Sequence, residues 1–183
     1  ETARDALRGD FSLVTHMFNA MTGVHHRAPG VVGAAMESDA SAMLICDGEH
    51  VHPAVVKMLV RAKGIEKVIL VTDAIAGAGM NEGEFELFGQ TVFVRDGRAM
   101  LGNGTLAGSV LTLNRAVVNA ARFAEIDCGA AAQMASLNPA HILNLEARGE
   151  LREGADADLV VMNHETGEVK LTMVGGQVVY RND

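Results

Sequence analysis

Three short apolar runs in the sequence each end in a polar side chain that could take part in chemistry. His16 follows SLVT, Asp47 follows AMLIC and Asp73 follows VILVT. The intervals between them are about the size of one strand–helix–strand crossover. Parallel strands buried on both faces have near-continuous apolar sequences, and enzymes built on parallel sheets carry their chemistry where such strands end. The spacing therefore predicts that these three side chains converge on one site.

Asp73 is the single residue that indicates a reaction most directly. A carboxylate at a strand end can act as general base for a metal-bound water and then give the proton to a leaving group. The alternative is that Asp73 caps the next helix. The segment that follows, AIAGAGMNEG, is rich in glycine and has no helical pattern, which weakens the capping interpretation.

Two further clusters could bind a metal or a substrate. THMFNAM places Asn19 three residues after His16, which suits a metal ligand beside a substrate-binding amide. Spacing alone favours a histidine that only forms hydrogen bonds in a loop, because short motifs match often by chance. DGEHVH offers two histidines and two acids in six residues. Alternation would place His50 and His52 on one side of an extended segment, as metal ligands could be, but a histidine before a helix can also simply cap it.

Two loops could bind an anion or a sugar. Arg27 lies in HHRAPG, and a loop arginine suits bidentate capture of a phosphate, although a solvated surface arginine is the commoner outcome. GNGTLAGS precedes a helical pattern, and its glycines can present backbone N–H groups to a ligand. It lacks the lysine of a P-loop, so nucleotide binding is not expected.

The elements that must hold these groups alternate between strand and helix in the first part of the chain. The expected strands are 12–17, 42–46 and 67–72. The expected helices are 1–9, from Pro53 to Gly64, 110–123, 127–136 and one opened by Asn138 as cap with Pro139 in its first turn. A β-hairpin insertion is expected over 83–101, around Asp96-Gly97, and a β pattern runs from Gly149 to the end. Three strand–helix units cannot close a barrel, so the simplest explanation is the carboxy-terminal portion of a larger enzyme.

Composition limits the possible function classes. The chain has 183 residues, 49% of them hydrophobic and only 4% aromatic, and a net charge of −8. This balance is typical of a globular domain with an aliphatic core and argues against nucleic-acid binding. Two cysteines do not make a disulfide framework, and Cys46 is expected to be a small buried hydrophobe. No membrane-spanning stretch or signal-like amino terminus is visible, so a cytoplasmic protein is expected.

Several ordered motifs together resemble the N-acetylglucosamine-6-phosphate deacetylase family of the amidohydrolase superfamily. They are THMFNAM, HHRAPG with VVGAA behind it, DGEHVHP, ILVTDAI, NGTLAGS with LTLNRAVVN, and ASLNPA, and they extend from residue 15 to about residue 162 with ADADLVVMN. The resemblance implies an α/β fold, a (β/α)8 TIM-type barrel of a metal-dependent hydrolase with a small β-sandwich. It places residues 1–146 in the later barrel units, with the insertion near 83–101, and residues 147–183 in the sandwich.

The resemblance also implies a role for each matched residue. Asp73 would be the catalytic base and acid, and His16 would bind a divalent metal, Zn²⁺ or else Fe²⁺. The family's other metal ligands, a glutamate and a histidine, lie upstream of the matched region, so this piece alone is expected to be inactive. Arg27 would bind the 6-phosphate, in some members across a homodimer interface. The remaining substrate contacts would come from Asn19, Ala20, Asp47, Gly48, Glu49, His50, Leu106, Ala107 and Gly108.

The expected reaction is metal-dependent hydrolysis of the acetamide of N-acetylglucosamine 6-phosphate, a small sugar phosphate, to glucosamine 6-phosphate and acetate. A dihydroorotase-like or deaminase-like amidohydrolase would suit ADADLVV but not THMFNAM or GTLAGS. A non-catalytic companion chain that pairs with a separate barrel half is the alternative of a different class.

Overall fold

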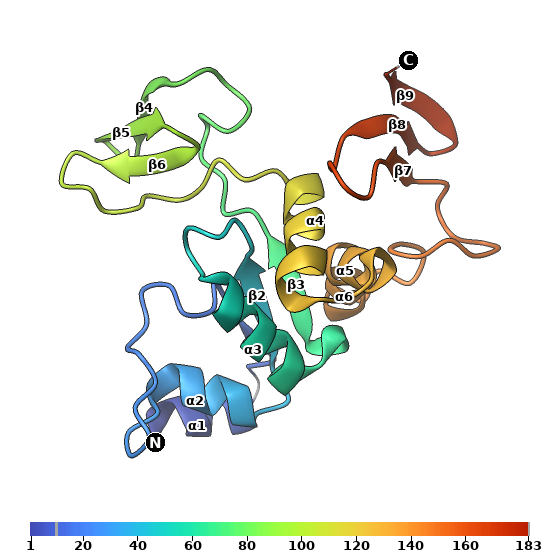
Figure 1. Ribbon diagram of the computed structural model, residues 1–183. Coiled ribbons are helices and arrows are strands. Elements are labelled where there is room, and N and C mark those ends of the chain that lie inside the picture. Colours follow the sequence, from blue (N-terminus) through green and yellow to red (C-terminus); the bar gives the residue numbers. More distant parts are fainter. Residues whose placement is uncertain (10, 183) are drawn as a thin grey trace.

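A computed structural model describes residues 1–9 and 11–182, and its centre is an α/β unit with a parallel sheet (Figure 1). The strands are β1 (Leu13–Val14), β2 (Ser41–Ile45) and β3 (Val68–Val71), in the order β1-β2-β3. Both pairings are parallel, and Ala42 of β2 lies opposite Val68 of β3. The three strands expected from the apolar runs are therefore confirmed.

β1 is shorter than the expected strand at 12–17. The chain turns from Thr15 onward, and only the backbone N–H of Met17 still donates to β2, at 2.7 Å from the carbonyl oxygen of Met43. Met17 is fully buried even so. The apolar side chain thus packs into the core without extended backbone, which explains why the hydrophobic pattern overestimates the strand.

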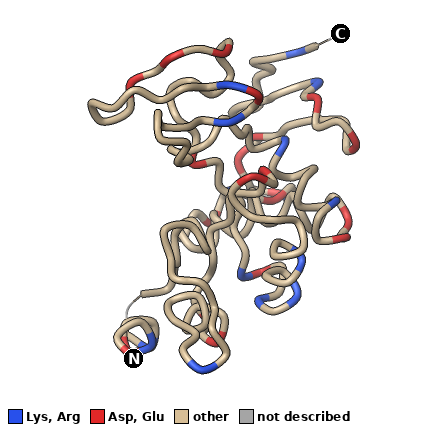
Figure 2. Tube along the Cα trace, turned by 60° about the vertical axis from the view of Figure 1, so that its left-hand side comes forward, with Lys and Arg blue, Asp and Glu red and all other residues tan. Residues whose placement is uncertain are grey.

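Helices cover the sheet and contribute to one aliphatic core. Leu44 and Ile45 of β2 and Val56 and Leu59 of a covering helix are all fully buried. Charged residues lie along helices, turns and the outer strands, and the three central strands contain none (Figure 2). The helices are α1 (Thr2–Arg8), α2 (Gly30–Glu37), α3 (Pro53–Lys63), the 3₁₀ turn η1 (Ile65–Lys67), α4 (Leu113–Ala124), α5 (Cys128–Ala135) and α6 (Leu137–Ile142).

The sequence signals for α3 are confirmed at both ends. His52 is its N-cap, with the ring Nδ1 accepting from the backbone N–H of Ala54 at 3.2 Å, and Pro53 occupies the first turn. Gly64 ends the helix with a φ of +79°, which a glycine adopts without steric cost.

The expectation that Asn138 caps a helix is wrong. α6 begins at Leu137, so Asn138 lies inside it, and its side chain is buried. The amide Nδ2 donates to the carbonyl oxygens of Ile65 at 2.7 Å and Val68 at 2.8 Å. Asn138 therefore stabilises the start of β3 rather than the helix end.

The insertion at 83–101 has three antiparallel strands and not a single hairpin. They are β4 (Gly83–Leu87), β5 (Gln90–Arg95) and β6 (Arg98–Leu101). Asp96-Gly97 forms the two-residue turn between β5 and β6, with φ values of +49° and +72° that suit a type I′ turn. The sheet has a small core of its own, which includes Val92, Val94 and Ala99.

The carboxy-terminal strands form a third sheet outside the α/β unit (Figure 1). They are β7 (Leu159–Met162), β8 (Val169–Val174) and β9 (Gln177–Arg181), with Gly175-Gly176 as the turn between the last two. The expected β pattern between Gly149 and Asp158 is wrong, because this segment consists of turns and irregular chain. Among the residues described, no helix is long and apolar enough to cross a membrane.

Candidate active site at the strand ends

His16, Asp47 and Asp73 follow the carboxyl ends of three neighbouring parallel strands. Each lies two residues beyond the end of β1, β2 or β3. Because β2 pairs with both other strands, these ends meet at the same edge of the sheet. The negative charge of Asp73 contributes to raising the pKa of His50, which lies in the loop after β2. The fold therefore brings the ends of the three strands to one edge of the sheet, as the spacing of the apolar runs predicts.

Asp47 and His50 form a nearly buried pair. His50 Nδ1 lies 2.6 Å from Asp47 Oδ2, and their side chains are only 7% and 15% exposed. Asp47 Oδ1 accepts from the backbone N–H groups of Glu49 and His50, each at 2.9 Å. Since a carboxylate only accepts, His50 Nδ1 carries the proton of this bond. Both Asp47 oxygens are thus engaged within the loop, and His50 Nε2 is the ring nitrogen left to meet a substrate.

The pair shifts the pKa of both partners. The bond to Asp47 raises the pKa of His50 more than burial lowers it, and the charges of Asp47, Asp73 and Glu49 add to the rise. Burial of Asp47 raises its pKa. The hydrogen bonds from the His50 ring and from two backbone N–H groups lower the pKa by more than burial raises it, so the pKa of Asp47 falls below its ordinary value. The arrangement therefore favours an imidazolium beside a carboxylate.

His16 occupies a tight turn directly after β1. Its φ is +29°, and its backbone carbonyl accepts from the Asn19 backbone N–H at 2.9 Å. The Asn19 side-chain amide also bonds to this turn, at 3.3 Å from the His16 oxygen and 3.2 Å from the Met17 oxygen. His16 Nδ1 is buried without a hydrogen-bond partner among the described residues. A buried nitrogen with no protein partner fits a metal ligand.

The described residues do not bring together enough ligands for a catalytic metal site. Within residues 1–9 and 11–182, no three His, Cys, Asp or Glu side chains come together as a metal-binding group. A catalytic zinc site normally has three protein ligands. His16 therefore has too few neighbouring ligands among the described residues to hold such an ion by itself.

The segment Leu106-Ala107-Gly108 lies beside the Asp73 loop. The backbone N–H of Ala107 donates to the carbonyl oxygen of Ala99 in β6 at 3.0 Å. Gly108 has a φ of +69°, and a Cβ there would lie 2.6 Å from Ile75 Cγ2 and 3.0 Å from the Asp73 carbonyl oxygen. Glycine is thus required for this close approach, which brings NGTLAGS next to the proposed base.

The other two residues of the DGEH loop make contacts that their sequence did not predict. Gly48 has a φ of +87°, and a Cβ there would lie 3.3 Å from Phe123 Cζ. Glu49 forms an ion pair with Arg98 at the start of β6, with 2.6 Å between Oε2 and Nη2. The outer sheet is thereby connected to the loop that carries His50.

Arg27 and Ala20 are the two remaining residues that the sequence predicts for the site. Both are exposed in the long connection between β1 and α2. Arg27 Nη1 lies 2.7 Å from Nε2 of its neighbour His26, whose ring lies 4.4 Å from that of His25 between centroids. The guanidinium is therefore accessible to an anion that approaches from outside.

Two polar residues that bind the ends of the strands were not predicted from the sequence. Ser109 is 2% exposed, and its hydroxyl donates to the carbonyl oxygen of Thr72 at the end of β3. Asn119 of α4 donates from Nδ2 to the carbonyl oxygen of Cys46, 2.9 Å away and immediately before Asp47. Burial raises the pKa of the Cys46 thiol to about 12, in agreement with its predicted role as a buried hydrophobe.

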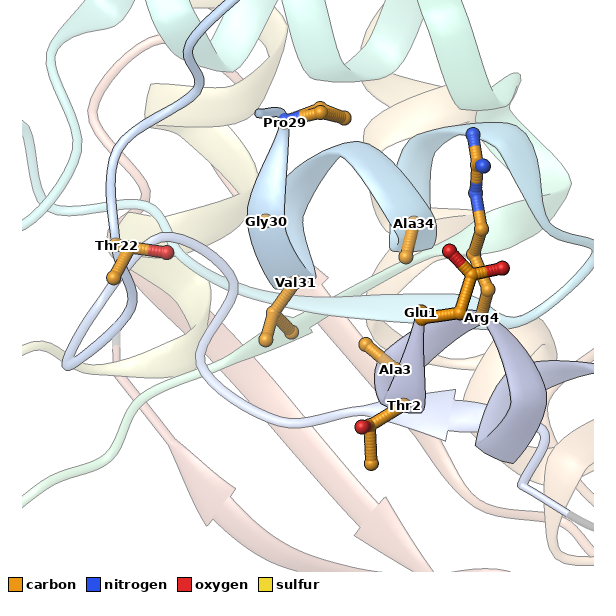
Figure 3. Close-up of a pocket in the computed structure, with 9 residues that line it drawn as sticks. All are labelled: Glu1, Thr2, Ala3, Arg4, Thr22, Pro29, Gly30, Val31 and Ala34. Carbon is orange, nitrogen blue, oxygen red and sulfur yellow. The ribbon is translucent and has the colours of Figure 1, made fainter. Parts of the chain in front are cut away.

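A separate pocket lies between α1 and α2 (Figure 3). Its walls include Thr2, Arg4, Thr22 and Val31, and none of the strand-end residues lines it. Figure 3 shows small and apolar residues around it together with the charged side chains of Glu1 and Arg4. Arg4 is already paired with Glu37, so the candidate active site remains the edge of the parallel sheet.

Deacetylases of phosphorylated amino sugars are among the known proteins to which the chain is similar. The chain is 39% identical over 178 residues to the N-acetylglucosamine-6-phosphate deacetylase of Bacillus subtilis (strain 168), covering 96% of this chain and 45% of that protein. It is 37% identical over 183 residues to the N-acetylgalactosamine-6-phosphate deacetylase of Shewanella sp. (strain ANA-3), covering 99% and 46%. The crystal structure of N-acetylglucosamine-6-phosphate deacetylase from Pasteurella multocida matches with a TM-score of 0.93 at 34% identity, over 98% of this chain and 47% of that chain.

The chain thus spans less than half the length of these three relatives. A model of the Amidohydrolase family matches residues 11–179, which is nearly all of it. The α/β architecture and the polar groups at the strand ends agree with that match. The chain belongs to the amidohydrolase family.

Proposed function

We propose that this chain is the carboxy-terminal part of an enzyme that hydrolyses the acetamide of N-acetylglucosamine 6-phosphate, releasing glucosamine 6-phosphate and acetate. The observation that carries the proposal is the placement of His16, the Asp47–His50 pair and Asp73 after three adjacent parallel strands. The names of the relatives supply the substrate class. The phosphorylated galactosamine analogue is the second candidate, because one relative bears that name.

The proposed architecture is a (β/α)8 barrel with a small β-sandwich. Residues 1–146 would form the later barrel units, with β4–β6 as an insertion, and residues 147–183 would supply sandwich strands. Two features support this division: the parallel sheet ends in unpaired edges at β1 and β3, and the last three strands expose many apolar side chains. The exposed side chains are Val160, Val161, Val174, Val178, Val179 and Tyr180.

The proposed reaction needs a divalent cation, Zn²⁺ or Fe²⁺, for which His16 would be one ligand. When bound, such an ion lowers the pKa of water and polarises a carbonyl group. The buried Nδ1 of His16, for which the described residues offer no hydrogen-bond partner, supports this role. The remaining ligands would come from a part of the protein outside this chain, so the 183 residues alone are expected to be inactive.

The residues of this chain would handle the proton and the substrate. The Asp73 carboxylate accepts a proton from the attacking water and returns it to the amide nitrogen, so that the C–O bond forms as the C–N bond breaks. His50, held through Nδ1 by Asp47, donates from Nε2 to the acetamide oxygen when it is an imidazolium. Asn19, Ala20 and the segment 106–108 would contact the sugar.

Arg27 would bind the 6-phosphate. Its exposed guanidinium, in the long connection between β1 and α2, suits a phosphate held between two subunits of a homodimer. On this proposal, Arg27→Lys weakens binding of the phosphorylated sugar, because bidentate contact to the phosphate is lost.

An acetate-release assay tests the proposed function. The full-length protein, loaded with Zn²⁺, is compared on N-acetylglucosamine 6-phosphate, N-acetylgalactosamine 6-phosphate and unphosphorylated N-acetylglucosamine. Turnover of a phosphorylated sugar, lost on metal chelation, supports the proposal, and the ratio of the first two kcat/KM values decides between the candidates. Absence of turnover on all three overturns it.

A further inference from the structure

One buried residue, Ser109, forms hydrogen bonds with the chain on both sides of Asp73. The Ser109 backbone N–H donates to the Asp73 carbonyl oxygen at 2.8 Å, and the Ser109 carbonyl accepts from the Ile75 N–H at 2.9 Å. Ala74 and Ser109 thus form an isolated parallel bridge, outside the named strands. The backbone is therefore fixed on both sides of Asp73.

The hydroxyl of Ser109 extends this connection in both directions along the chain. It donates to the carbonyl oxygen of Thr72, the residue before Asp73, and accepts from the backbone N–H of Leu111 at 3.0 Å. Leu111 leads into α4, and Ser109 is 2% exposed, so water cannot replace either bond. One side chain thus ties the end of β3 to the start of α4.

Asp73 depends on this backbone support more than most residues would. Its φ is +50°, in the left-handed region that residues other than glycine seldom adopt. No hydrogen bond or ion pair to its carboxylate is formed by any described side chain, and the residue is exposed. The backbone therefore sets the position from which the side chain projects, and with it the region that the carboxylate can reach.

We propose that Ser109 is a positioning residue for Asp73: its hydroxyl bond to Thr72 and its backbone bonds to Asp73 and Ile75 fix the backbone from which the catalytic carboxylate projects. The inference rests on the proposed deacetylase activity for its catalytic consequence, while the structural consequence stands by itself. Small displacements of a catalytic group lower the rate without a matching change in substrate binding.

Kinetics of Ser109→Ala in the full-length, metal-loaded enzyme test the catalytic consequence. We expect kcat on N-acetylglucosamine 6-phosphate to fall by about tenfold to a hundredfold with KM changed less than about threefold, since a misplacement near 1 Å can cost about 10²-fold. The matched control is Ser136→Ala, which removes an exposed hydroxyl bond of 2.7 Å to the Ala132 carbonyl and should leave kcat unchanged.

A double-mutant cycle with Asp73→Glu separates positioning from general damage. The longer side chain already displaces the carboxylate, so Ser109→Ala should cost at least fivefold less in kcat in that background than in the parent. Equal losses of kcat in both backgrounds would overturn the proposal. They would show that Ser109→Ala lowers kcat independently of where the carboxylate of residue 73 lies.

Hydrogen–deuterium exchange supplies a readout that does not depend on activity. In Ser109→Ala, the amides of Ile75 and Ser109 should exchange at least tenfold faster, while the amides of β2 keep their parent rates. Unchanged exchange at both amides would overturn the proposal even if kcat falls. If the parent protein shows no acetate release, the proposed function fails, and the exchange result still decides whether Ser109 holds this loop.

Discussion

His50 Nδ1 and Asp47 Oδ2 lie 2.6 Å apart, and the second Asp47 oxygen accepts from the backbone N–H of the same histidine. Asp47 therefore binds both the ring and the backbone of His50, and these two bonds fix the orientation of the ring relative to the backbone of the loop. Because Nδ1–H is committed to Asp47, His50 can donate from Nε2 only when it is protonated. The raised pKa of His50 is therefore useful to an oxygen-polarising role.

Asp47→Asn should lower the pKa of His50. The substitution removes the charge and the carboxylate bond that raise this pKa, and leaves the burial that lowers it. Titration of the His50 ring resonances by NMR measures the change. Glu165→Gln is the control, because Glu165 lies 3.9 Å from the exposed His164 and should leave the pKa of His50 as it is. An unchanged His50 pKa in Asp47→Asn would contradict the pairing.

Stability should depend on pH through the same pair. The pKa of His50 is raised above its ordinary 6.5, so its contribution is complete below that pH and is lost as pH rises through the raised value. The pKa of Asp47 is lowered below 3.8, so its contribution is complete above that pH and is lost as pH falls through the lowered value.

The free energy of unfolding lost in the double variant Asp47→Asn/His50→Gln should therefore be largest between pH 3.8 and 6.5. Its size there should be about 1–3 kcal/mol, as for other buried hydrogen-bonded groups. Urea unfolding at several pH values measures it, and a loss that is constant across the range would show that the pair does not titrate with folding.

The ion pair between Glu49 and Arg98 should be weak. Its side chains are 39% and 49% exposed, and such pairs contribute about 0.2–1 kcal/mol, which is screened further at high salt. A double-mutant cycle of Glu49→Gln and Arg98→Gln, by urea unfolding at low and high salt, measures the coupling. If instead Glu49 binds the sugar directly, Glu49→Gln raises KM while Arg98→Gln does not, and the coupling is absent.

Asn138→Ala should destabilise the protein strongly. The change removes the Asn138 donor from the buried Val68 carbonyl oxygen, at about 1–3 kcal/mol, while the part-buried Ile65 carbonyl oxygen keeps the backbone N–H of Val68 as a second donor. Asn182→Ala is the control, because its amide makes one exposed bond to Glu168 and should cost less than about 0.5 kcal/mol. Equal unfolding midpoints for the two variants would contradict the role assigned to Asn138.

Local sequence signals predicted most of the central unit. Continuous apolar runs located β2 and β3, and Pro53 with Gly64 located both ends of α3, because these preferences are properties of a few adjacent residues. The Asp96-Gly97 turn was predicted for the same reason. β1 came out shorter because a buried side chain, Met17, needs no extended backbone.

Local sequence patterns could not predict the hydrogen bonds between polar residues that are far apart in the sequence. Ser109 bonds to a residue 37 positions away, and Asn119 and Asn138 bond to residues 70 or 73 positions away. Nothing in the neighbouring letters distinguishes these side chains from surface serines and asparagines. Asn before Pro is a common helix start, so the sequence predicts a cap at Asn138, whereas the structure has Asn138 inside α6.

The most direct test of the central claim is acetate release from N-acetylglucosamine 6-phosphate by the full-length, metal-loaded protein and by its Asp73→Asn variant. Asp96→Asn is the matched control, since Asp96 is an exposed turn residue with almost the same φ, +49° against +50°. The account predicts that Asp73→Asn lowers kcat by about 10²–10⁴-fold while Asp96→Asn has no effect. A parent enzyme that turns over and an Asp73→Asn variant within about threefold of it would contradict the account, because the base would then lie elsewhere.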